Sequence, residues 1–232
     1  LKTNQVILNI DDINFQNWKK INDNKRVITI SLNNNADYFI KSSDRSNYSF
    51  STVKGDFSIR RDYVSDILPI NLLFSISLSM EAGASIEDVK NGLKSFEGVN
   101  GRFRSYISSK KAIIIDDSYN ANPESMKSSL NQLKQYNENK IFVMGDMGEL
   151  GKKSREHHLS IFNTAKTQNI MYLFYMGKYK DEAKSIFGDS CFVYNDISQL
   201  IEDVRELMNE NTVVLIKASR FMNFDLIAKG LK

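Results

Sequence analysis

The fold of the second half of the chain is set by residues 112–133, which read AIIIDDSYNANPESMKSSLNQL. Residues 112–115 form a short apolar run with the composition of a buried β-strand. Asn122 and Pro123 then supply a helix N-cap and a first helical residue, and apolar residues recur behind them at spacings of four and three. The stretch therefore predicts a strand, a polar loop and an amphipathic helix in succession.

The same alternation continues to the end of the chain. Further apolar runs, separated by helical stretches, occupy residues 141–144, 171–176, 191–194 and 213–216. Short apolar strands that alternate with amphipathic helices favour a mostly parallel sheet covered on both faces. We therefore expect an α/β fold, with a Rossmann-like domain over residues 103–232.

Residues 1–102 show a different pattern, in which β-rich segments come first and two helices follow. Short β-rich segments fall near residues 6–9, 27–31, 38–41, 48–53 and 57–60. Two helices follow, one with Pro69 as its first helical residue and one that begins with a capping box of Ser85 and Asp88. Because Gly98 and Gly101 interrupt the pattern, we expect a domain boundary after Arg102, with a hinge at Gly101-Arg102.

Composition excludes several classes of function. Of 232 residues, 31 are Lys or Arg and 28 are Asp or Glu, and a net charge of +3 is too small to indicate nucleic-acid binding. One cysteine and two histidines indicate neither a disulfide nor a metal site. No apolar run approaches the roughly 18–20 residues of a membrane span. We therefore expect a cytoplasmic protein with no nucleic-acid partner. A monomer is also expected, although no feature of the sequence fixes the oligomeric state.

Ligands of open parallel sheets bind beyond the carboxyl ends of the strands, so the loops after the apolar runs are the candidate site. The first loop, residues 116–123, carries Asp117 and Asn120, whose oxygens could accept hydrogen bonds from ribose hydroxyls. Two alternatives stay open at this loop: Asn122 is merely a helix cap, and Asp117 is merely a turn residue.

Two further loops complete the candidate site. Residues 145–154, GDMGELGKKS, miss the phosphate-binding pattern G-x-x-x-x-G-K-S/T, since Asp146 replaces its first glycine and Lys153 its final hydroxyl residue. The alternative is a glycine-rich turn in which Ser154 caps the next helix. In the third loop, Lys217, Ser219 and Arg220 could hold a carboxylate or a phosphate, or could form a solvated basic turn.

Other reactive residues indicate no catalytic centre. His157 and His158 are adjacent and therefore diverge on a helix, and neither has a second ligand at metal-binding spacing. Cys191 lies inside an apolar run and is interpreted as a small buried hydrophobic residue. From the residues alone, the sequence predicts a ligand-binding α/β domain and no particular reaction.

The motifs at these loops resemble those of one known family, the Mur ligases. The segments that carry the resemblance, in family order, are VILNIDD at 6–12, Asn71, Gly101-Arg102, DDSYNANP at 116–123, GDMGELG at 145–151, Ser154 with His158, and VLIKASR at 214–220. The chain departs from the family pattern at Ala218, which replaces a usual glycine, and at Ile67, where many members have histidine.

The resemblance implies a fragment of a longer enzyme. Residues 1–102 match the latter part of the central ATPase domain, and residues 103–232 match the complete C-terminal ligase domain. The N-terminal domain, the P-loop and the Mg²⁺ ligands of the family would precede Leu1. We therefore expect the chain alone to lack ligase and ATPase turnover.

The branch of the family with the greatest resemblance joins D-alanyl-D-alanine to UDP-N-acetylmuramoyl-tripeptide. It uses ATP and Mg²⁺ to form an acyl phosphate that the dipeptide amine attacks, a cytoplasmic step of peptidoglycan synthesis that serves cell-wall biogenesis, cell shape and division. Closure about the hinge would bring the amine donor and the acyl phosphate together and exclude water.

Residue roles follow from the same resemblance. Asn71 would contact adenine, Arg102 the nucleotide phosphates and Asp117 the ribose, with Asn120 beside it. The residues that would hold D-alanyl-D-alanine are Lys217, Ser219 and Arg220. No catalytic residue and no metal ligand is assigned within the chain. The ribose role requires an Asp117 carboxylate that is open to the ligand.

Two alternative functions remain. One is another ATP-dependent ligase of the superfamily, such as a folylpolyglutamate-type enzyme, although relatives of that kind carry a histidine-containing version of the NANP segment at 120–123. The other is a non-catalytic α/β binding module, in which Asp117 and Lys217 are ordinary surface residues. The sequence also leaves open whether the third residue of the acceptor peptide is diaminopimelate or lysine.

Overall fold

The computed structural model describes residues 3–44, 46–64 and 67–232. The chain divides into two compact units, Leu1–Glu97 and Gly98–Lys232, and each is described by itself. Leu1, the first residue of the predicted central-domain segment 1–102, lies outside the described residues. The predicted boundary after Arg102 falls just inside the second unit.

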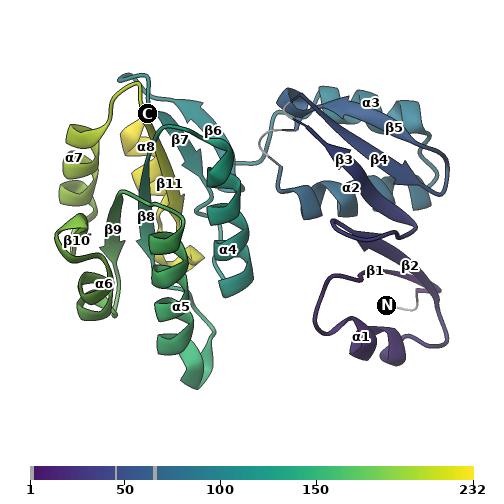
Figure 1. Cartoon of the computed structure of the whole chain (residues 1–232), viewed down its shortest axis with the longest axis horizontal. Coiled ribbons are helices and arrows are strands. Elements are labelled where there is room, and N and C mark those ends of the chain that lie inside the picture. Colours follow the sequence, from purple (N-terminus) through teal and green to yellow (C-terminus); the bar gives the residue numbers. More distant parts are fainter. Residues whose placement is uncertain (1–2, 45, 65–66) are drawn as a thin grey trace. The chain divides into compact units, whose positions relative to one another are not determined.

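The described part of the first unit contains a five-stranded sheet in chain order (Figure 1). The first three strands pair in parallel and the last three antiparallel. The elements are β1 (Gln5–Asn9), α1 (Phe15–Ile21), β2 (Arg26–Ser31), β3 (Tyr38–Ser43), β4 (Asn47–Thr52), β5 (Phe57–Arg60), α2 (Pro69–Glu81) and α3 (Ile86–Lys94).

Alternation of apolar and polar residues explains how the first unit packs. Tyr48 and Phe50 of β4 are buried, and the residues between and after them are more exposed. The buried face packs against an apolar stripe of α2 and, through Val89, against α3. The capping box of Ser85 and Asp88 that the sequence predicts at the start of α3 is confirmed.

The second unit contains a six-stranded sheet in the order β10-β9-β8-β11-β7-β6. Strands β7 to β11 run parallel and β6 pairs antiparallel with β7, so the predicted mostly parallel α/β sheet is confirmed. The strands are β6 (Arg104–Ile107), β7 (Ile113–Asp116), β8 (Asn139–Gly145), β9 (Tyr172–Met176), β10 (Cys191–Val193) and β11 (Thr212–Lys217). The helices are α4 (Pro123–Gln132), α5 (Ser154–Thr167), α6 (Lys180–Phe187), α7 (Ile197–Leu207) and α8 (Asp225–Leu231).

Helices cover both faces of this second sheet. α4, α5 and α6 pack side by side, while α7 packs against α8 (Figure 1). One core cluster joins alternate residues of the central strands to α7 and α8. Burial from both sides explains why β11 is an apolar run rather than an alternating one: all of its residues are buried.

The topology places the three candidate loops at one edge of the sheet. β11 lies between β7 and β8 and is parallel to both, with Ile216 opposite Asp116 and Lys217 opposite Met144. The carboxyl ends of the three strands therefore meet, as the sequence predicts.

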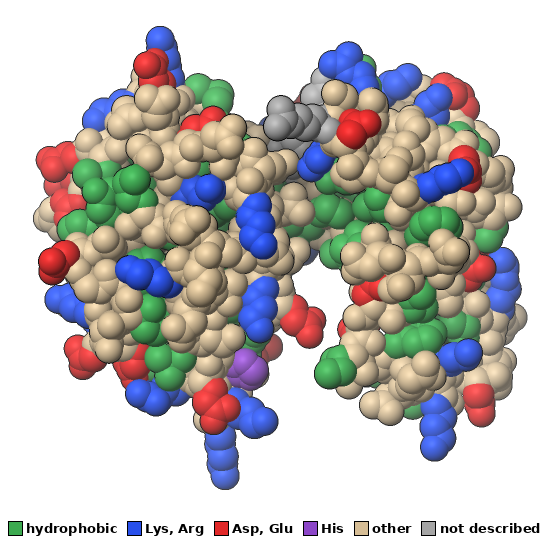
Figure 2. Space-filling view, in the orientation of Figure 1, with side chains coloured by type: hydrophobic (Ala, Val, Ile, Leu, Met, Phe, Trp, Pro, Cys, Tyr) green, Lys and Arg blue, Asp and Glu red, His purple; other side chains and the backbone are tan. Residues whose placement is uncertain are grey.

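Surface composition matches the small net charge. On the face shown in Figure 2, basic and acidic side chains are interspersed over each unit. None of the helices within the described ranges is both long enough and apolar enough to span a bilayer.

Candidate ligand site at the carboxyl edge of the second sheet

The first loop is organised by its own polar side chains. The buried carboxylate of Asp116 accepts a 2.6 Å hydrogen bond from the Ser118 hydroxyl. Asn122 caps α4 by accepting a hydrogen bond from the backbone N–H of Ser125 at 2.8 Å, so its predicted role as a cap is confirmed. Asn120 is exposed, and its side-chain oxygen accepts a hydrogen bond from the next backbone N–H.

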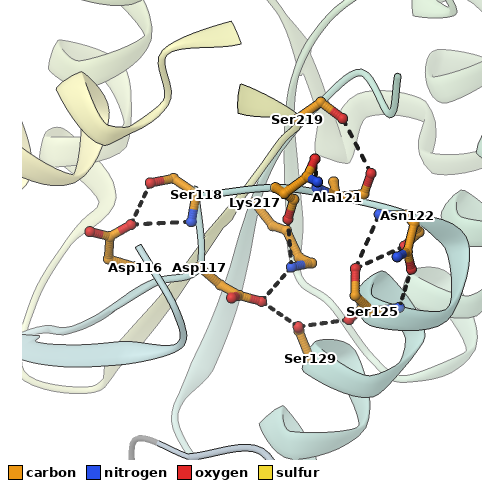
Figure 3. Close-up of polar contacts among 10 residues, drawn as sticks. Asp116, Asp117, Ser118, Ala121, Asn122, Ser125, Ser129, Lys217 and Ser219 are labelled. Atoms are coloured by element: carbon orange, nitrogen blue, oxygen red, sulfur yellow. Dashed lines mark hydrogen bonds and ion pairs between the residues drawn. The ribbon is translucent and has the colours of Figure 1, made fainter. Parts of the chain in front are cut away.

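Asp117 forms the centre of a buried network (Figure 3). Its Oδ2 accepts hydrogen bonds from Lys217 Nζ and from the Ser129 hydroxyl, both at 2.6 Å. The carboxylate also accepts a hydrogen bond from the backbone N–H of Phe103. Burial raises the pKa of Asp117, and these three donors oppose that rise. The carboxylate is thus fully engaged inside the unit.

Lys217 is the partner of Asp117 rather than of an external ligand. Only 2% of its surface is exposed, and its Nζ also donates to the backbone carbonyl of Asn120 at 3.1 Å. Asp117 was expected to be open to a ribose and Lys217 to a dipeptide, but both side chains are buried in this structure. The alternative that both are ordinary surface residues is wrong, because both are buried.

Ser219 connects all three loops. Its hydroxyl donates to the carbonyl of Ala121 at 3.2 Å and accepts a hydrogen bond from the N–H of Gly148 at 2.7 Å. Its own N–H donates to the carbonyl of Asp146 at 3.0 Å. With 4% of its surface exposed, Ser219 fixes the edge of the sheet instead of presenting a hydroxyl to solvent.

Asp146 of the glycine-rich loop and His158 of α5 turn their side chains inward. Asp146 is buried and accepts a hydrogen bond from the hydroxyl of Tyr175. His158 is fully buried: its Nε2 accepts the N–H of Met147 at 2.9 Å, and its Nδ1 lies 2.7 Å from the carbonyl of Ser154. This pair of contacts requires a neutral ring protonated at Nδ1, and burial lowers the His158 pKa accordingly.

The predicted capping role of Ser154 is wrong. Residues 151–153 form a 3₁₀ turn that runs directly into α5, so Ser154 is already the first residue of the helix. The N-cap position is occupied by Lys153, which makes no side-chain capping bond.

Gly101, Arg102 and Phe103 form a turn fixed to the first loop. The carbonyl of Gly101 accepts the N–H of Tyr119 at 2.9 Å, and Phe103 is anchored through Asp117 and its buried side chain. Gly101 has φ +73°, and a Cβ atom there would lie 3.1 Å from the backbone nitrogen of Tyr119, so glycine is strongly favoured. Hydrogen bonds of Gly101 and Phe103 hold this turn to the first loop of the second unit, so the backbone at the expected hinge, Gly101-Arg102, is restrained.

Three predicted residues present exposed side chains. Arg102 places its guanidinium 4.2 Å from the centroid of the Tyr119 ring. Arg220 is exposed and pairs with Asp225 at 3.0 Å. Asn71 is exposed on the first turn of α2, in the first unit.

Sequence reasoning missed Ser129, Phe103 and Tyr119 as parts of this site. Ser129 and Phe103 bind Asp117 from outside the loop, and no local pattern marks them. The described residues contain no group of three His, Cys, Asp or Glu side chains that could hold a metal ion. Cys191 is buried as predicted, and burial raises the pKa of its thiol to about 11.

Together, the topology and these loops define an open α/β domain of the ligand-binding class. A buried polar network fixes the carboxyl-edge loops. Asn120 and Arg220 are exposed on these loops, and Arg102 is exposed on the turn that is hydrogen-bonded to the first loop. Comparison with known families gives a more specific assignment. A family described as "Mur ligase, glutamate ligase domain" matches residues 101–220, which is more than half of the chain. The chain belongs to the Mur ligase family.

Relatives of one kind match nearly the whole chain. A UDP-N-acetylmuramoyl-tripeptide–D-alanyl-D-alanine ligase of Buchnera aphidicola is 29% identical over 100% of this chain and 52% of its own length. The Escherichia coli ligase of that name is 27% identical over 98% of this chain and 52% of its own length. The chain thus spans about half the length of the relatives it matches.

Solved structures share the fold. The crystal structure of a MurF ligase from Thermotoga maritima in complex with ADP superposes with a TM-score of 0.79 at 20% identity. The superposition covers 98% of this chain and 52% of that protein.

Proposed function

We propose that this chain acts in an ATP-dependent ligase that joins D-alanyl-D-alanine to UDP-N-acetylmuramoyl-tripeptide during peptidoglycan precursor synthesis. The observation that carries the proposal is that two relatives of this name, from Buchnera aphidicola and Escherichia coli, align with 100% and 98% of the chain. In the same proposal, residues 1–102 belong to a central ATP-binding domain and residues 103–232 form the C-terminal ligase domain. The buried, unpaired Cys191 is compatible with the reducing cytoplasm, where this step would occur.

The exposed residues are assigned to the ligands. Arg102 would bind the nucleotide phosphates, since its guanidinium is exposed and forms no ion pair with any residue the structure describes. Asn71 would contact adenine, and Asn120 would lie beside the nucleotide. Arg220 would bind the carboxylate of D-alanyl-D-alanine, for which its planar donors are suited.

The buried residues have a supporting role in this proposal. Asp117, Lys217 and Ser219 hold the loops so that the exposed groups keep fixed positions, which favours a productive encounter of bound reactants. ATP would supply the activation of the acceptor carboxylate as an acyl phosphate, from which the dipeptide amine displaces phosphate. We assign no Mg²⁺ ligand to this chain, because the described residues provide no cluster that fits a metal ion.

Binding of D-alanyl-D-alanine to the 232-residue chain tests the proposal. Calorimetric or NMR titration should show saturable binding of this dipeptide, with L-alanyl-L-alanine much weaker. Arg220→Gln should weaken binding, whereas Lys229→Gln should not, although Lys229 pairs with the same Asp225 at 3.1 Å. Equal binding of the two stereoisomers, or none of either, would contradict the proposal.

Turnover provides a second test. The 232-residue sequence contains no G-x-x-x-x-G-K-S/T motif, so the purified chain should release no ADP from ATP, with or without D-alanyl-D-alanine. Nucleotide affinity should also be weak, about millimolar, which corresponds to about 4 kcal/mol.

A further inference from the structure

Arg102 is held in a way that differs from Arg155 and Arg220 of the second unit. Arg155 and Arg220 each contact a carboxylate, Glu182 at 2.7 Å and Asp225 at 3.0 Å. Arg102 instead lies over the ring of Tyr119, 4.2 Å from its centroid. A carboxylate partner neutralises an arginine and occupies its N–H donors, whereas an aromatic ring contacts only the face of the guanidinium.

The backbone on both sides of Arg102 is fixed to the loop that carries Tyr119. Gly101 accepts the N–H of Tyr119, and Phe103, with φ +59° and 3% of its surface exposed, donates its N–H to Asp117. A side chain as long as arginine still keeps large rotamer freedom on a fixed backbone. Among the residues that the structure describes, the ring of Tyr119 lies against the Arg102 guanidinium and restrains this side chain.

We infer that Tyr119 is a positioning residue, whose ring holds the Arg102 guanidinium flat so that its edge N–H donors can bind a phosphate oxygen of the nucleotide. The inference rests on the proposed function, in which Arg102 contacts the nucleotide. Tyr119 is 48% exposed, and its contact with Arg102 is made through the face of the ring rather than through the hydroxyl. The ring should therefore matter and the hydroxyl should not.

A double-mutant cycle with ADP as the probe tests this inference. NMR titration of the 232-residue chain should give about tenfold weaker ADP binding for Arg102→Gln and about threefold weaker binding for Tyr119→Leu, while Tyr119→Phe should bind like the unmodified chain. In the Arg102→Gln background, Tyr119→Leu should have no further effect, since the ring would act only through the guanidinium.

A readout without ligand accompanies the cycle. Protons of the Arg102 side chain should show ring-current shifts that persist in Tyr119→Phe and disappear in Tyr119→Leu. The inference is overturned if those shifts are absent, if Tyr119→Leu binds ADP normally, or if it weakens binding equally with and without Arg102. Any of these results would overturn the role of Tyr119 without contradicting the proposed function. If the unmodified chain shows no saturable ADP binding, both the role of Tyr119 and the proposed function are contradicted.

Discussion

Replacement of Lys217 by methionine should test the buried network most severely. Lys217 and Asp117 are 2% and 6% exposed, and their charged atoms lie 2.6 Å apart. Methionine is similar in length to lysine but uncharged, so Lys217→Met leaves Asp117 with only the Ser129 hydroxyl and the Phe103 N–H. The change therefore removes the compensating cation and adds little cavity volume.

The expected cost is large. Removing one partner of a buried ion pair destabilises a protein by about 3–5 kcal/mol. At roughly 3 °C per kcal/mol for a domain of this size, the melting temperature should fall by about 10–15 °C. Without Lys217, burial should raise the pKa of Asp117 further above its unfolded value. Such a carboxyl group favours the folded state at low pH and loses that contribution as pH rises through its folded pKa, so the deficit should shrink on acidification.

Urea unfolding followed by far-UV circular dichroism measures the effect. Trp18, the single tryptophan, lies in α1 of the first unit, so its fluorescence reports separately on that unit. Lys229→Met serves as a matched control, because it removes an exposed lysine of the same unit. A loss of less than about 1 kcal/mol for Lys217→Met, or a deficit that does not change between neutral and acidic pH, would refute the reasoning.

Three further predictions concern His158, Gly145 and Cys191 of the second unit. Burial lowers the pKa of His158 below its ordinary 6.5, so stability should fall as pH drops below that value. The urea midpoint should fall less over this pH range in His158→Gln than in the unmodified chain. Gly145→Ala should lower the unfolding free energy by about 1–3 kcal/mol, because its Cβ would lie 2.6 Å from Ala218 Cβ, whereas Gly92→Ala on α3 meets nothing within 4 Å and should raise thermal stability slightly. The buried thiol of Cys191, with a pKa of about 11, should react with a disulfide reagent only after unfolding; rapid reaction of the native chain would contradict its burial.

Much of the second unit could be predicted from the sequence because its strands are buried on both faces. The apolar runs at 141–144 and 213–216 are short and continuous, and the residues between them show helical periodicity. These patterns are local, so they predict β8 and β11 without knowledge of the fold. The antiparallel β6 was not predicted, because its four residues, RSYI, carry too little pattern.

The site was predicted less well, for a physical reason. Lys217 and Asp117 are 100 residues apart in the chain, and only the placement of β11 beside β7 brings them together. Sequence reasoning treats a charged residue after a strand as available for a ligand, since buried charges are uncommon. Because Asp117 and Lys217 pair with each other, neither charge needs a ligand. These two motif residues therefore stabilise the loops, and the sequence alone does not distinguish that role from contact with a ligand.

The loops after β7, β8 and β11 are proposed to form a ligand site, and backbone amide NMR of the 232-residue chain, with ADP and D-alanyl-D-alanine added separately, tests this proposal. ADP should shift amides in residues 101–103 and 117–122, and the dipeptide should shift amides in residues 217–222. Shifts confined to the opposite edge of the sheet, around residues 109–111 and 208–211, would contradict it.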